Sequence, residues 1–253
     1  MLTKYGFCRI VQSILVVLIA AALKLYYSAA SVDDLRWILA PTTFLVELRS
    51  GKSFDFESHA GYMSSDHSFL IAASCSGINF LIISFLMLGL GKLWRHTLEP
   101  ARWQSLPATL LVAYFTTVAA NAVRIYIALW LHETKPQIFG MSAGELHRVE
   151  GILVYFGFLL MLFAASDNSI SAEKNILERV RRFSLPLVIY YAATLGIPVL
   201  NGSYREPRFW KHASFVVFTP FLLITTVAAF GIIRDQLLRR RRSMSHPESL
   251  GST

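Results

Sequence analysis

Three residues of types used in covalent catalysis stand in or beside long apolar stretches of this sequence. Cys75 lies near the start of one stretch, Arg124 lies inside a second, and His147 comes just before a third. A thiol can serve as a nucleophile, an imidazole can take up its proton, and a guanidinium can stabilise a developing negative charge. If the fold brings the three together, they predict an enzyme with a cysteine nucleophile.

The neighbours of Cys75 are small or polar, and the local sequence is Ser-Cys-Ser-Gly-Ile-Asn. If a helix begins near Ser74, Cys75 lies in its first turn, where the helix dipole favours a thiolate. Asn79 follows four residues later on the same helix face, and we predict that its amide binds substrate or an oxyanion. The alternative is that Cys75, Ser76 and Gly77 are small residues that allow close helix packing.

Arg124 is the least expected residue, because an arginine within a membrane span is costly and normally faces the bundle interior with a partner. Asn121, three residues earlier, shares its helix face, and we predict that it also binds substrate or an oxyanion. Arg124 is expected to hold a substrate carbonyl or to lower the pKa of Cys75. The alternative is a structural ion pair with Glu150.

His147 is the natural proton acceptor for a thiol on the same side of the membrane. Glu150, three residues later, is placed to orient its ring, and Gly151 would allow another helix to approach closely. Four other histidines are predicted on the same side, in loops, and rank lower: His59, His67, His132 and His212.

Composition indicates an all-α, polytopic membrane protein. Of the 253 residues, 54% are hydrophobic and only 16% are charged, against about 25% charged in an average soluble domain. The net charge of +8 is assigned to loops that stay in the cytoplasm, so no nucleic-acid partner is expected. Cys8 and Cys75 are predicted at opposite faces and form no disulfide. We expect no metal site and no cofactor.

Residues 1–253 are predicted to form one membrane domain of about six spans, with a basic tail at 234–253. The spans are expected at 10–27, 69–90, 106–131, 149–165, 185–200 and 213–233. The stretch 37–48 is too short to span and is predicted to be interfacial or re-entrant, within an ordered polar segment at 28–68. Part of the basic loop 166–184 is predicted to be an amphipathic surface helix.

Loop charges predict the orientation. Of the 24 Lys and Arg residues, 14 lie on the side of the termini and 7 on the other side, which places both termini in the cytoplasm. Cys75, Arg124 and His147 then all lie at or near the outer face. A cleaved signal peptide ending near Ala30 is a less favoured alternative, because the first apolar run is long and Tyr26 and Tyr27 stand where small residues are needed.

The order and spacing of Ser-Cys-Ser-Gly-Ile-Asn-Phe, then Asn121-x-x-Arg124-Ile125, then His147-x-x-x-Gly151 resemble the exosortase/archaeosortase family. The segment 37–57, with Leu39-Ala40-Pro41 and Leu45-Val46-Glu47, together with the short chain, is most similar to exosortase K. The similarity is strong over about 37–151 and loose beyond. Many members of the family have eight spans, whereas six plus one short segment are predicted here.

The resemblance implies a membrane cysteine protease or transpeptidase of the bacterial inner membrane. Its partner would be the C-terminal sorting-signal helix of exported proteins, of the PEP-CTERM type. Cys75 would be the nucleophile, Arg124 the transition-state stabiliser and His147 the proton acceptor. Archaeal relatives often have arginine at the histidine position, so Arg148 stays an alternative for the third role. Two other functions stay open: an intramembrane serine protease using Ser76, and a transporter or assembly factor with an Arg124–Glu150 ion pair.

Overall fold

The computed structural model describes residues 4–95, 105–136, 140–166 and 184–245. Its long helices are α1 (Lys4–Ala29), α3 (Ile78–Arg95), α4 (Ser105–Thr134), α5 (Ala143–Ser166) and the longest, α10 (Pro207–Ser245). The predicted surface helix within 166–184 and most of the loop between α3 and α4 lie outside the described residues.

Two further helical segments follow α5 in the described chain. The predicted fifth span is α8 (Ser184–Tyr191), a π-helical turn η2 (Ala192–Gly196) and α9 (Ile197–Leu200). The π turn ends two residues before Pro198, which lacks an N–H and would clash with the carbonyl of Thr194 in a regular helix. After a short turn η3 (Ser203–Arg205), helix α10 runs over Pro207–Ser245.

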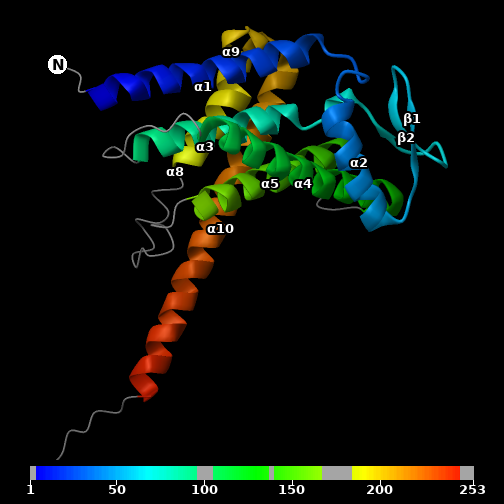
Figure 1. The fold of residues 1–253 in the computed structure, drawn as a ribbon. Coiled ribbons are helices and arrows are strands. Elements are labelled where there is room, and N and C mark those ends of the chain that lie inside the picture. Colours follow the sequence, from blue (N-terminus) through cyan, green and yellow to red (C-terminus); the bar gives the residue numbers. More distant parts are fainter. Residues whose placement is uncertain (1–3, 96–104, 137–139, 167–183, 246–253) are drawn as a thin grey trace, which may run out of the picture.

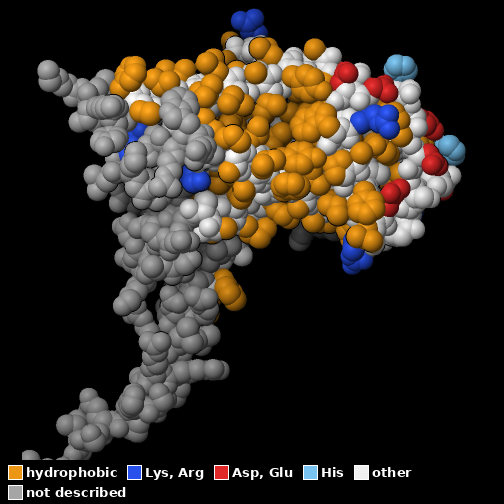
Figure 2. Space-filling view, in the orientation of Figure 1, with side chains coloured by type: hydrophobic (Ala, Val, Ile, Leu, Met, Phe, Trp, Pro, Cys, Tyr) orange, Lys and Arg blue, Asp and Glu red, His pale blue; other side chains and the backbone are white. Residues whose placement is uncertain are grey.

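The all-α membrane class is confirmed. Among the described residues, four helical segments are long and apolar enough to cross a membrane: Gly6–Ala29, Ala73–Leu93, Ser105–Thr134 and Ala143–Ser166. Ser184–Leu200 is apolar but shorter. Apolar side chains cover the surface over the helices, whereas acidic and histidine side chains gather at one end and Lys and Arg side chains are more widely spread (Figure 2). This distribution suits a bundle surrounded by lipid. The count of six spans stays a prediction.

The polar segment between α1 and α3 is ordered, and it holds more secondary structure than the sequence indicated. Helix α2 (Arg36–Ser50) packs against α4, where the Tyr114 hydroxyl donates to the Trp37 carbonyl at 2.8 Å. Three short antiparallel strands follow, in the order β1 (Phe54–Glu57), β2 (Gly61–Ser64) and β3 (Leu70–Ile71). The predicted short segment is therefore a 15-residue helix, and its entry into the membrane stays a prediction.

The second predicted span begins later than expected. Residues 70–71 pair with β2 and Ala73–Cys75 form a 3₁₀ turn η1, so α3 starts only at Ile78. Gly77 has a φ of +74°, a left-handed conformation that ends the η1 turn before α3 can begin. The prediction that Cys75 lies in the first turn of a membrane helix is therefore wrong.

Candidate active site

Helices α3, α4 and α5 lie side by side, and the start of α3, the end of α4 and the start of α5 lie at the same end of the bundle (Figure 1). The small sheet and α2 lie at that end too. Because Cys75 precedes α3, Arg124 is on the last three turns of α4 and His147 is in the first turns of α5, the fold brings the three predicted residues to one end. Which side of the membrane this end faces stays a prediction.

Arg124 and His147 are in direct contact across the α4–α5 interface. The guanidinium Nη2 of Arg124 lies 3.2 Å from Nε2 of His147. Gly151 makes this possible, because a Cβ at that position would lie 3.1 Å from Nε of Arg124. The expected close approach at Gly151 is thus made by the Arg124 side chain. Since a guanidinium only donates hydrogen bonds, Nε2 of His147 is the acceptor and its ring proton is on Nδ1.

Glu150 lies on the other side of the His147 ring. Its Oε2 is 3.6 Å from Nδ1 of His147, which carries the proton in this arrangement. The side chain is only 7% exposed, and neither carboxylate oxygen has a hydrogen-bond partner among the described residues. No ion pair joins Glu150 to Arg124 in the part of the chain that the structure describes, so the geometry does not support the alternative of a structural Arg124–Glu150 pair.

Asn121 binds the backbone of the nucleophile's turn. Its Nδ2 donates to the carbonyl of Cys75 at 2.5 Å, and its Oδ1 accepts from the hydroxyl of Tyr155 at 2.8 Å. Asn121 is fully buried, and Gly77 packs directly against its side chain. Both ends of the amide are therefore engaged within the protein. This geometry favours a positioning role, and the predicted contact of Asn121 with substrate is untested.

Cys75 is half-buried and lines a cavity of about 520 Å³ whose other walls are mainly apolar, with contributions from Phe69, Leu131 and Met141. Arg124 lines a neighbouring cavity of about 390 Å³, and His147 lines both. Cys75 and Arg124 are thus on neighbouring cavities that share His147. Within the described residues, however, the thiol makes no hydrogen bond to His147.

Asn79 lines the cavity that also contains Arg124 and His147. Its side chain is exposed, and its Oδ1 accepts a hydrogen bond of 2.9 Å from Nζ of Lys24 on α1. The argument that Asn79 shares a helix face with Cys75 fails, because α3 begins between them. The Lys24 bond nevertheless occupies the amide oxygen and leaves the Nδ2 donor for a ligand.

The competing candidates differ in their surroundings. Ser76 is fully buried and its hydroxyl has no hydrogen-bond partner among the described residues, so nothing there would activate it. The guanidinium of Arg148 lies 6.0 Å from the ring of Phe215 on α10, although Arg148 also lines the Arg124 cavity. Of the histidines ranked lower, His132 lines the Cys75 cavity and His212 the Arg124 cavity.

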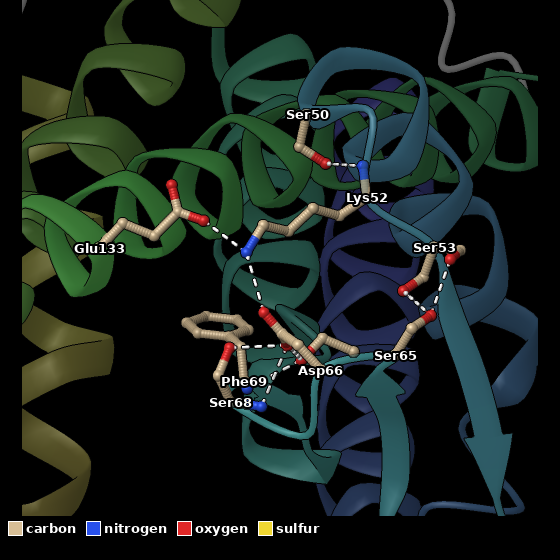
Figure 3. A network of polar contacts seen from close by, with 9 residues as sticks. Ser50, Lys52, Ser53, Ser65, Asp66, Ser68, Phe69 and Glu133 are labelled. Atoms are coloured by element: carbon tan, nitrogen blue, oxygen red, sulfur yellow. Dashed lines mark hydrogen bonds and ion pairs between the residues drawn. The ribbon is translucent and has the colours of Figure 1, made fainter.

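A polar network joins the turn before β3 to the end of α4 (Figure 3). Nζ of Lys52 lies 3.3 Å from Asp66 and 2.5 Å from Glu133. Asp66 also accepts hydrogen bonds from Ser64 and Ser68, which hold its pKa below the usual value. The bond to Glu133 raises the pKa of Lys52. This network fixes the turn before β3, four residues ahead of η1.

Sequence reasoning missed Tyr155 and Lys24. Tyr155 follows His147 and Gly151 at intervals of four residues, so all three share one face of α5, and this spacing was a usable signal. Lys24 gave no such signal, because its partner Asn79 is 55 residues away. In the described part of the chain, no group of three or more His, Cys, Asp and Glu side chains is placed to hold a metal ion.

The fold and this site define a class: polytopic helical membrane proteins in which cysteine, arginine and histidine side chains lie at one end of the bundle. The family described as transmembrane exosortase matches residues 48–164, a range that contains Cys75, Arg124 and His147. This match supports the exosortase family and does not distinguish the K subtype. No curated protein and no solved structure matches the chain.

Proposed function

We propose that this protein is an exosortase most similar to exosortase K, a cysteine protease or transpeptidase that processes C-terminal sorting signals of exported proteins, of the PEP-CTERM type. The observation that carries the proposal is the contact of Arg124 with His147, which also lines the cavity of the half-buried Cys75 thiol. A base and a fixed cation joined in this way suit acyl transfer to a thiol. The site would lie at the outer face of the bacterial inner membrane, with both termini in the cytoplasm.

In the proposed reaction, Nε2 of His147 takes the thiol proton and the sulfur of Cys75 attacks the scissile carbonyl. Arg124 and Nδ2 of Asn79 stabilise the oxyanion that forms. His147 then returns the proton to the amide nitrogen as the C–N bond breaks, which leaves a thioester. Water, or an amine or glycan of the envelope, attacks the thioester and releases the thiol.

The substrate-free geometry adds one requirement. The lone pair of His147 Nε2 is engaged by Arg124, so it is not free to accept the thiol proton. Arg124 must turn toward the developing oxyanion as the reaction begins. The carboxylate of Glu150, 3.6 Å from Nδ1, would then face the imidazolium and stabilise it.

The test compares processing of an exported reporter that carries a PEP-CTERM-type signal, in cells that express the full chain. We expect Cys75→Ser and Cys75→Ala to abolish processing, while Cys8→Ser and Ser76→Ala retain it. Each variant must insert at wild-type levels. Unchanged processing in Cys75→Ala would overturn the mechanism, and loss only in Ser76→Ala would favour the serine protease.

A second measurement tests the side of the membrane. In a Cys8→Ser background, a membrane-impermeant thiol reagent added to intact cells is expected to label Cys75. Absence of labelling in an inserted, folded protein would contradict the proposed orientation.

A further inference from the structure

Tyr155 contacts both Arg124 and Asn121, the residue that binds the turn carrying Cys75. Its hydroxyl donates to Oδ1 of Asn121 at 2.8 Å and lies 3.4 Å from Nη1 of Arg124. Its ring stacks on Phe80 of α3, with centroids 4.9 Å apart and an interplanar angle of 11°. The hydroxyl is therefore held between α3, α4 and α5 at a defined place.

The directions of these hydrogen bonds follow from the chemistry of each group. A guanidinium only donates, so the Tyr155 oxygen accepts from Arg124. The single hydroxyl proton of Tyr155 then goes to Asn121 Oδ1, which turns the amide Nδ2 toward the carbonyl of Cys75. The result is one directed chain from the Arg124 guanidinium to the backbone of the nucleophile.

We propose that Tyr155 is a positioning residue that couples the placement of Cys75 to that of Arg124. Without its hydroxyl, Asn121 Oδ1 loses its donor and the amide is free to rotate. A rotated amide would place its oxygen against the Cys75 carbonyl, which repels it and releases the η1 turn. Arg124 would lose an acceptor at the same time. Tyr155 acts through Asn121 and Arg124 and takes no part in bond making.

This inference rests on the proposed function. Two readouts distinguish a failure of the inference about Tyr155 from a failure of the proposed function. The first is reporter processing. The second is the rate at which iodoacetamide alkylates Cys75 in the full chain with Cys8→Ser, which needs no sorting signal. If Cys75→Ala does not affect processing, the proposed function fails. The alkylation rate still reports whether Tyr155 positions the thiol.

The test variant is Tyr155→Phe, which keeps the stacked ring and removes only the hydroxyl. We expect reporter turnover to fall about 10- to 100-fold, as for loss of a hydrogen bond to a charged group, with a smaller change in apparent KM. Alkylation of Cys75 at pH 7 should also slow. The matched control is Tyr191→Phe, which removes a 2.8 Å bond from a tyrosine hydroxyl to the Val217 carbonyl, between two residues that line neither cavity.

A double variant separates positioning from general destabilisation. If Tyr155 acts through Asn121, then Tyr155→Phe combined with Asn121→Ala should be no slower than the worse single variant. Wild-type turnover and alkylation in Tyr155→Phe would overturn the proposal, and so would losses that multiply in the double variant. Should Tyr155→Phe insert poorly, unchanged Cys75 alkylation in Asn121→Ala would overturn the proposal, because Tyr155 acts on Cys75 through Asn121.

Discussion

Nη2 of Arg124 and Nε2 of His147 lie 3.2 Å apart, although the two residues belong to different helices and are separated by 23 positions in the chain. The contact joins the only Lys or Arg side chain of α4 to the proton acceptor proposed for catalysis. It also engages the lone pair of Nε2, which Arg124 must release before His147 can accept the thiol proton. The predictions below begin from this contact.

Arg124→Lys keeps the positive charge and removes the planar guanidinium, which donates hydrogen bonds from several nitrogens at once. A lysine ammonium is a point charge and does not reproduce the two-sided contact with His147 and Tyr155. We expect reporter processing to fall at least about 100-fold, the effect typical of losing an oxyanion donor. The control is Arg49→Lys, whose guanidinium lies 4.8 Å from the ring of Tyr126. Neither residue lines the two cavities, so this replacement should preserve processing. Equal activity of Arg124→Lys would contradict the proposed role.

Glu150→Gln should separate activity from stability. Replacing a buried, unpartnered carboxylate by a neutral amide removes a desolvation cost, so we expect thermal stability in detergent to stay the same or rise. Processing should fall about 10-fold or more, because the imidazolium of His147 loses its counter-charge. Glu145→Gln serves as the control, since Glu145 pairs with Lys211 at 2.8 Å instead. A variant that is destabilised and fully active would refute this account.

Gly77→Ala and Gly51→Ala form a matched pair. Both glycines have a left-handed backbone, with φ of +74° and +72°, so either substitution should destabilise the fold by about 1 kcal/mol. Only at Gly77 would the new Cβ press on Asn121, 3.1 Å from its Cγ, whereas Gly51 has open space. We therefore expect processing to be lost in Gly77→Ala and kept in Gly51→Ala, at similar melting temperatures. Similar activity of both would show that the contact is unimportant.

Protonation of Asp66 should loosen the 52–69 segment, which contains β1 and β2, at low pH. Its folded pKa lies below the usual 3.8 because Ser64, Ser68 and Lys52 donate hydrogen bonds to the carboxylate. A lowered folded pKa contributes stability that is present above the unfolded pKa and is lost as the pH falls through the folded pKa. Limited proteolysis of the 52–69 segment should therefore increase as the pH falls below about 4, near the unfolded pKa of aspartate.

Asp66→Asn supplies the comparison for that experiment. The variant should be cleaved faster than wild type at pH 7 and should lose the acid-dependent increase. Asp55→Asn, on β1 outside the Lys52 network, is the control. A wild-type profile in Asp66→Asn would show that the network does not hold the turn.

The sequence by itself determined the membrane class, the approximate places of the helices and the three residues that meet at one end. These follow from properties carried by single segments: long apolar runs, the cost of an arginine in lipid, and turn residues between spans. The helical class is confirmed. Cys75, Arg124 and His147 come to the same end of the bundle because consecutive helices run antiparallel.

Only the tertiary structure decided how those residues are held. The start of α3 depends on β3 pairing with β2, a contact outside the helix itself, and this pairing placed Cys75 on a turn. The partners Lys24 and Tyr155 come from segments far from the amides that they bind, at 55 and 34 positions along the chain. Hydrogen bonds of this kind depend on distances of a few ångströms between packed helices, and neither composition nor periodicity encodes such distances.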